Sequence, residues 1–161
     1  MKLYIAGPDV FRPHAIEWAE NVRALCLQEG HQALIPLDGM QTTATGIYHN
    51  NLRLIGEADV VLANLNPFRG AEPDSGTCVE VGYALALGKT VIGYADTLIP
   101  MRDRLQAAAP GADGNCLDAA GWAVENFGLP LNLMLSVPVQ LEQGGIEVAL
   151  RALRQRLAGG G

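Results

Sequence analysis

The sequence has little of three things: aromatic residues, basic residues and cysteine. Aromatic side chains make up 6% of the chain, and 11 Lys and Arg stand against 17 Asp and Glu, for a formal charge of −6. Nucleic-acid binding draws most of its non-specific affinity from clustered Lys and Arg. We therefore expect no nucleic-acid partner and favour a small-molecule ligand.

The three cysteines are an odd number without paired spacing, so neither a disulfide framework nor a zinc site is indicated. We expect Cys26, Cys78 and Cys116 to be small buried apolar side chains. Cys78 could be offered as a nucleophile, but the scattered histidines give it no base adjacent in sequence. We expect neither a metal nor a cofactor.

Long apolar runs are absent as well. The N-terminal stretch "MKLYIAGPDV" has an apolar run of only four residues before Gly-Pro-Asp, too short for a signal peptide or a membrane span. We therefore expect a cytoplasmic protein with no membrane partner. The 161 residues, 49% apolar and 17% charged, predict one domain spanning 1–161 with a buried sheet.

What the sequence does contain is an alternation of short apolar runs and amphipathic stretches. The predicted strands are "KLYIAG", "HQALIPL", "DVVLANL" and "KTVIGYA", and the predicted helices are residues 14–29, "IYHNNLRLIGEA" and about 76–88. This order predicts a doubly wound α/β fold, Rossmann-like or flavodoxin-like, whose mostly parallel sheet has helices on both faces. Beyond residue 98, "MRDRLQAAA" predicts a helix, "GADGN" a loop and "QGGIEVALRALRQRLAGGG" a closing helix with a loose tail.

One carboxylate, Glu80, lies within the apolar stretch "DSGTCVEVGYALALGK" that opens the helix after the third predicted strand. Thr77-x-x-Glu80 fits a capping box, in which the glutamate reaches back to the cap backbone N–H. Asp74 or Ser75 could also cap this helix. On this interpretation Glu80 is a structural residue.

Three features favour a functional role for Glu80 instead. It shares a helical face with Ala84 and Leu87, where a single negative charge lowers stability unless it has a partner, and is retained where it has a function. Gly82 has no side chain and so leaves room for another group to approach the helix, at a cost of about 1 kcal/mol of helix stability relative to Ala. Tyr4 falls near the end of the first predicted strand, and ligands of parallel sheets bind outside the carboxyl ends of strands. Its phenol could therefore orient the carboxylate.

The two carboxylates at this helix start, Asp74 and Glu80, suit glycosidic chemistry. In such chemistry one carboxylate attacks an anomeric carbon through an oxocarbenium-like transition state. The sequence has no Walker lysine motif, and "GPDVFRPHA" lacks the G-x-G-x-x-G spacing. Both NTP hydrolysis and dinucleotide binding are therefore disfavoured.

Three segments together resemble the nucleoside 2-deoxyribosyltransferase family: "YIAGPDVF", "ADVVLANLNPFRGAEPDSGTCVEVGYALALGK" and "FGLPLNLML". The resemblance covers most of residues 3–135 and implies one domain of this type over 1–161. It implies a ping-pong exchange of nucleobases on 2-deoxyribose, with 2'-deoxyribonucleosides and free nucleobases as the small-molecule partners.

The resemblance also implies roles for individual residues. Glu80 matches the nucleophile that attacks C1' and holds a covalent deoxyribosyl-enzyme, and Tyr4 matches the tyrosine that positions it. Asp74 matches the aspartate that hydrogen-bonds sugar hydroxyls. Asn132 matches an asparagine that reaches into a neighbouring subunit's site, which implies a homo-oligomer.

The chain departs from the family pattern at Asn51. Family members often carry an aspartate there that protonates the leaving base, and an asparagine cannot deliver a proton at neutral pH. Asn51 could still hydrogen-bond a base edge. Asp38 or Asp9 would be the substitute acids.

The remaining candidates for substrate binding lie in the two loops around these residues. Gly7 belongs to the "AGP" turn, and Phe11 and Phe68 could sandwich a base or could pack on their own loops. Arg69 could hydrogen-bond a purine edge, or pair with Glu72 and order its loop. Met134 is expected to pack.

Two rival functions stay open. One is a hydrolase with the same glutamate, acting on a deoxynucleoside or a deoxynucleotide, in which water takes the sugar from the enzyme. Few basic residues flank the expected site, which favours a free nucleoside over a nucleotide. The other is a non-catalytic nucleoside sensor, in which Glu80 is only a cap or an anchor.

Overall fold

The computed structural model describes residues 1–39, 41–107 and 115–159. Five parallel strands form its central sheet, in the order β2-β1-β3-β4-β7. These strands are β1 (Lys2–Ala6), β2 (Gln32–Leu34), β3 (Val60–Asn64), β4 (Thr90–Ala95) and β7 (Gln140–Gln143). This is the flavodoxin-like order, so the predicted doubly wound parallel sheet is confirmed.

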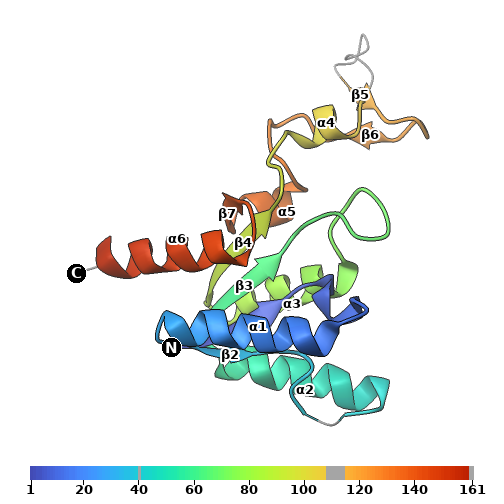
Figure 1. Cartoon of the computed structure of the whole chain (residues 1–161). Coiled ribbons are helices and arrows are strands. Elements are labelled where there is room, and N and C mark those ends of the chain that lie inside the picture. The colour runs from blue at the N-terminus through green and yellow to red at the C-terminus, as the bar shows by residue number, and fades with distance from the viewer. Residues whose placement is uncertain (40, 108–114, 160–161) are drawn as a thin grey trace.

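Four long helices cover the two faces of the sheet (Figure 1). They are α1 (Ala15–Gln28), α2 (Ala44–Glu57), α3 (Ser75–Ala86) and α6 (Ile146–Gly159). Alternate residues of each strand face opposite layers. On β1, Leu3 and Ile5 pack in the core that contains residues of α1 and α6, whereas Tyr4 packs with residues of α2 and α3. Tyr4 therefore points toward the helix that carries Glu80.

Each predicted strand and long helix is present within a few residues of its expected ends. β2 stops just before Ile35 and Pro36, as the proline predicts, because proline cannot continue a sheet ladder. Helix α2 begins earlier than the predicted "IYHNNLRLIGEA", since Thr43 caps it and the Thr43 side chain accepts from the Gly46 N–H at 3.1 Å.

The carboxyl-terminal third holds elements that the sequence did not indicate. Strand β7 was missed because Gln140–Gln143 is mostly polar and pairs only at the sheet edge, beside β4. After β4 the chain makes an arm that reaches away from the sheet (Figure 1). The elements in the described part of this arm are short: α4 (Met101–Arg104), the hairpin of β5 (Cys116–Leu117) and β6 (Ala123–Val124), and then α5 (Leu133–Ser136) nearer the sheet.

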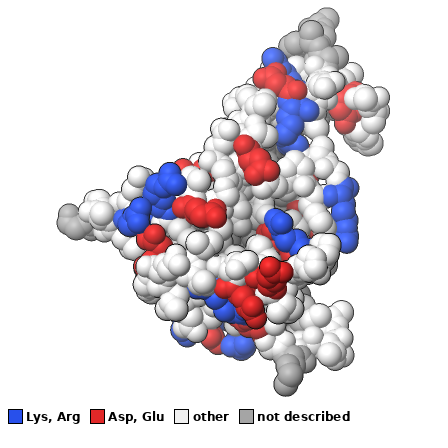
Figure 2. Space-filling model, in the orientation of Figure 1, with Lys and Arg blue, Asp and Glu red and all other residues white. Residues whose placement is uncertain are grey.

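The helix predicted for "MRDRLQAAA" is only one turn long. The last two residues of that predicted segment, and most of the predicted "GADGN" loop, lie outside the described part of the chain. Of the tail, Gly160 and Gly161 also lie outside it. No helix within the described ranges is long and apolar enough to cross a membrane. On the face seen in Figure 2, Lys and Arg are scattered among Asp and Glu.

Candidate active site

Helix α3 begins at a cap that differs from the predicted capping box. The N-cap residue is Asp74, whose Oδ2 accepts from the Thr77 backbone N–H at 2.9 Å and from the Thr77 hydroxyl at 3.1 Å. Thr77 lies inside the helix, and the carboxylate of Glu80 makes its bonds elsewhere. The prediction of a Thr77–Glu80 capping box is wrong, and the alternative cap at Asp74 is confirmed.

The Glu80 carboxylate is held by two donors from other elements. The Tyr4 hydroxyl, on β1, donates to Oε1 at 2.7 Å, and the Asn51 amide Nδ2, on α2, donates to the same oxygen at 3.2 Å. Among the described residues, Oε2 receives no hydrogen bond. One oxygen is thus fixed by the protein and the other is available to react.

Burial governs the acid–base properties of this group. It raises the pKa of Glu80 to about 7, an effect that the hydrogen bonds from Tyr4 and Asn51 oppose and the negative charge of Asp74 reinforces. Burial, together with the adjacent carboxylate, raises the pKa of Tyr4 well above its usual range. Tyr4 therefore stays protonated and donates, while Glu80 changes charge near neutrality.

Glu80 opens onto a cavity of about 390 Å³ at the carboxyl ends of β1, β2 and β3. This is the crevice position in which α/β proteins with this strand order bind ligands. The lining residues come from the turns after the strands and from α2 and α3: Gly7, Val10, Phe11, Pro36, Leu37, Gly39, Gln41, Ile47, Asn51, Asp74, Gly76, Thr77 and Glu80. The volume and the mixed lining suit a small polar molecule with an apolar face.

Asp9 has a structural environment outside the cavity lining. It is 3% exposed, accepts from Asn64 Nδ2 at 2.7 Å and pairs with the Arg12 guanidinium at 2.6 Å. Gly7 allows this arrangement, because a Cβ there would lie 2.8 Å from the Asn64 Cβ at a φ of +155°. The turn after β1 is thus locked by a buried carboxylate.

Asp38 is also engaged away from the cavity. Its carboxylate pairs with Arg23 and accepts from the Ile35 N–H at 2.8 Å. Of the described residues that line the cavity, only Asp74 and Glu80 carry a carboxyl group.

The two phenylalanines stack on each other. The rings of Phe11 and Phe68 lie 5.5 Å apart and nearly parallel, and the Arg69 guanidinium lies over both, at 5.1 and 4.7 Å. A base cannot lie between rings that already contact each other, so this arrangement does not contain the predicted sandwich. Only Phe11 lines the cavity, and it is 58% exposed.

Arg69 has the loop-ordering environment that was one of its two predicted roles. Its φ of +55° places it in the left-handed region, and the guanidinium covers the two rings. The predicted partner Glu72 pairs with Arg104 instead, at 3.2 Å. Arg104 also donates to the carbonyls of Ala71 and Pro130, which joins the loop before α3 to the loop before α5. No sequence pattern pointed to Arg104, because all three of its partners lie far away in the chain.

Asn132 lies on the other flank of α3 from Glu80. It caps α5, its Nδ2 donates to Glu125 at 2.7 Å, and it lines a second cavity together with Cys78 and Gly82. Cys78 and Gly82 are four residues apart on the helix and face away from Glu80. Within one chain, Asn132 is not part of the Glu80 cavity.

Cysteine chemistry is not favoured by the structure. Cys26 and Cys116 are buried, as predicted, whereas Cys78 is only partly buried. Burial, with the nearby carboxylates of Asp74 and Glu72, raises the pKa of the Cys78 thiol. A thiol of raised pKa is a poor nucleophile at neutral pH.

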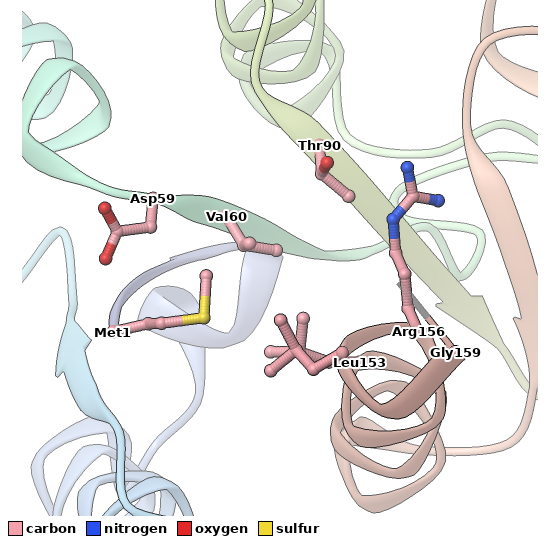
Figure 3. Close-up of a pocket in the computed structure, with 8 residues that line it drawn as sticks. Met1, Asp59, Val60, Thr90, Leu153, Arg156 and Gly159 are labelled. Carbon is pink, nitrogen blue, oxygen red and sulfur yellow. The ribbon is translucent and has the colours of Figure 1, made fainter. Parts of the chain in front are cut away.

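A larger cavity, of about 640 Å³, lies at the amino ends of β3 and β4, at the opposite end of the sheet (Figure 3). Asp59 and Arg156 lie on opposite sides of it. Asp59 accepts from the backbone N–H of Lys2 at 2.7 Å. This cavity offers no paired reactive groups, so the Glu80 cavity is the candidate active site.

Comparisons with known proteins identify the family to which the chain is similar. The family model for nucleoside 2-deoxyribosyltransferases matches residues 3–134. A 2-deoxyribosyltransferase from Leishmania mexicana is similar at 37% identity and a TM-score of 0.80, over 95% of this chain and 97% of that one. An uncharacterized protein of Schizosaccharomyces pombe is 30% identical over 91% of this chain and 80% of its own length. A CMP N-glycosidase from Clostridium botulinum, at 14% identity and a TM-score of 0.53 over 96% and 99% of the two chains, shares the fold.

Proposed function

The chain belongs to the nucleoside 2-deoxyribosyltransferase family, and we propose that it exchanges the nucleobase of 2'-deoxyribonucleosides through a covalent intermediate on Glu80. The observation that carries this proposal is the one-sided fixing of the Glu80 carboxylate. Oε1 accepts from Tyr4 and Asn51, and Oε2 is left for an electrophile in the cavity. A held carboxylate with one available oxygen suits attack on an anomeric carbon.

The reaction has two balanced steps. Oε2 bonds to C1' while the bond from C1' to the base nitrogen breaks, and the base leaves with that electron pair and takes up a proton. A second base then uses a ring-nitrogen lone pair to attack C1', the ester bond breaks, and the carboxylate is regenerated as the new nucleoside loses a proton. Two inversions at one carbon give net retention.

Asp74 is the group that we assign to the sugar. Both of its intramolecular bonds use Oδ2, so Oδ1 is the oxygen available to accept from a sugar hydroxyl. A base would then stack on the cavity side of Phe11, whose other face rests on Phe68. Gly7, in the turn after β1, lines the same cavity and would face the substrate with its backbone.

We also propose a homo-oligomer in which Asn132 completes a neighbouring subunit's site. Its place across α3 from Glu80 supports this, as do the exposed apolar side chains beside it, Met134 and Val137, each 72% exposed. Mixing two inactive variants, Glu80→Ala and Asn132→Ala, tests the sharing directly. Exchange should return in the mixed assemblies, whereas a site contained in one chain would give no complementation.

The exchange itself is tested by incubating the protein with deoxyinosine and adenine and following deoxyadenosine by chromatography. Formation of deoxyadenosine supports the transferase, and Glu80→Ala should abolish it without loss of the fold. Release of hypoxanthine without exchange would indicate the hydrolase. Thermal stabilisation by nucleoside, with neither reaction, would indicate the sensor.

We place the reaction in the cytoplasm. The free thiols of Cys26, Cys78 and Cys116 suit a reducing compartment. Labelling of Cys78, the thiol that is only partly buried, in intact cells by a membrane-permeant reagent and not by an impermeant one would agree with this location.

A further inference from the structure

Asn51 lies at the position where the family resemblance suggests a residue that acts on the leaving base, yet its contacts point elsewhere. Its Nδ2 donates to Glu80 Oε1 at 3.2 Å. Its Oδ1 is buried and has no hydrogen-bond partner among the described residues. A carbonyl oxygen closed off in this way is out of reach of a base in the cavity. What Asn51 offers to the site is therefore its amide N–H, and that group is directed at the nucleophile.

An unpaired buried acceptor normally costs stability. The opposite orientation of the amide would place Oδ1 against the carboxylate oxygen of Glu80, which is repulsive when Glu80 is ionised. The Asn51–Glu80 bond thus fixes the amide orientation, and the unpaired Oδ1 is its consequence.

The other acids that could act on the base are occupied. Asp9 is buried against Asn64 and Arg12, and Asp38 pairs with Arg23. In the described part of the cavity lining, Asp74 is the only carboxyl group besides Glu80, and it caps α3. Apart from Asp74 and Glu80, no carboxyl group in the described part of the cavity lining is therefore placed to protonate a base.

We propose that Asn51 is a positioning residue for the nucleophile, which together with Tyr4 clamps Oε1 of Glu80, and that the leaving base takes its proton from water. This inference rests on the proposed function, since it assigns a role within that reaction. Oε1 becomes the carbonyl oxygen of the sugar ester, and both donors can stay on it while Oε2 bonds to C1' and is later released. Bases with a ring nitrogen that water protonates readily, such as N7 of purines, are the substrates that this arrangement favours.

The test compares two 2-deoxyribosyl donors that differ in their need for a proton. Deoxyinosine releases a base that must be protonated, whereas 4-nitrophenyl β-2-deoxyribofuranoside releases a phenolate that needs none. If Asn51 acts on Glu80, Asn51→Leu should slow both donors by a similar factor, about 10- to 100-fold, because a hydrogen bond to a charged group is lost. If Asn51 acts on the base, deoxyinosine alone should slow, and that result would overturn the proposal.

The pH dependence of kcat/KM provides a second readout. The titratable groups that face Glu80 are Tyr4 on β1 and Asp74 at the start of α3. Asn51→Asp keeps the side-chain shape but replaces a donor by a carboxyl group, so the acidic limb of the profile should move to higher pH with both donors. An unmoved limb would contradict the clamp. This variant also serves if Asn51→Leu fails to fold.

Failure of the two proposals can be told apart. A wild-type protein that turns over neither donor, or a Glu80→Ala variant that turns over both, would remove the proposed function and this inference with it. A wild-type protein active on both donors, with Asn51→Leu impaired on deoxyinosine alone, would remove only the inference.

Discussion

Replacing Glu80 by glutamine should stabilise the protein while it abolishes activity. Glutamine keeps an oxygen that accepts from Tyr4 and Asn51, but it cannot carry the buried charge. A carboxyl group whose pKa rises from 4.5 to about 7 costs about 3 kcal/mol at neutral pH, at about 1.36 kcal/mol per pH unit between the two values. This is an upper figure for the gain, since the new amide N–H₂ must also find partners.

The sign of the pH dependence follows from linkage. The unfolded carboxyl group ionises above pH 4.5 and the folded one only near pH 7, so in this window the folded state holds more protons. The wild-type protein therefore loses stability as the pH rises through the window, and the variant does not. The difference should be small below pH 4.5, grow up to about pH 7 and stay constant above it.

Thermal unfolding at pH 4.5 and pH 8 measures this difference. For a chain of this size, about 3 kcal/mol corresponds to a rise in Tm of roughly 6 to 12 °C at pH 8. Glu17→Gln is the matched control, because Glu17 is exposed in the first turn of α1 and the same chemical change there should leave Tm nearly unchanged. A Glu80→Gln variant that is less stable at pH 8, or that still exchanges bases, would refute the reasoning.

Three further substitutions have expected outcomes. Tyr4→Phe removes a donor from Glu80, so the pKa of Glu80 should rise and the acidic limb of the kcat/KM profile should move to higher pH; an unmoved limb would show that the hydroxyl does not act on the carboxylate. Asp74→Ala removes the cap of α3 and should cost about 1 kcal/mol in urea unfolding. It should also raise KM for nucleoside, and the acidic limb of the kcat/KM profile should move to lower pH because a negative charge near Glu80 is lost. Gly7→Ala should cost about 1 to 3 kcal/mol in urea unfolding, because the new methyl meets Asn64; a neutral result would show that the turn can shift.

The fold was largely readable from the sequence where strands are buried on both sides. Val60–Asn64 and Thr90–Ala95 are mostly apolar because helices cover both faces of the sheet, so each strand reads as a nearly continuous apolar run in the sequence. Gln140–Gln143 was missed because it is an edge strand with partly exposed side chains, and such a segment has no apolar pattern to find.

The candidate site was less predictable, since its contacts join distant segments. Tyr4 and Glu80 are 76 positions apart, and their places relative to the strands, together with the family resemblance, suggested that they meet. The Thr77–Glu80 pattern fitted a capping box locally, but in the structure Glu80 accepts hydrogen bonds from residues of other elements and Asp74 is the N-cap. The sequence left Phe11 and Phe68 either around a base or packed on their own loops, and in the structure they stack on each other.

The sequence by itself determined the layers of the fold, the edge of the sheet at which a ligand is expected and the presence of a carboxylate, Glu80, in an apolar stretch. These features depend on local periodicity and on the direction of strands, which are properties of short segments. Only the tertiary structure decided what Glu80 does with its two oxygens. Tyr4 and Asn51 reach Oε1 from two other elements, and burial between these elements brings the pKa of Glu80 near neutrality. Hydrogen-bond direction and desolvation are properties of groups in space, and no spacing along the chain specifies them.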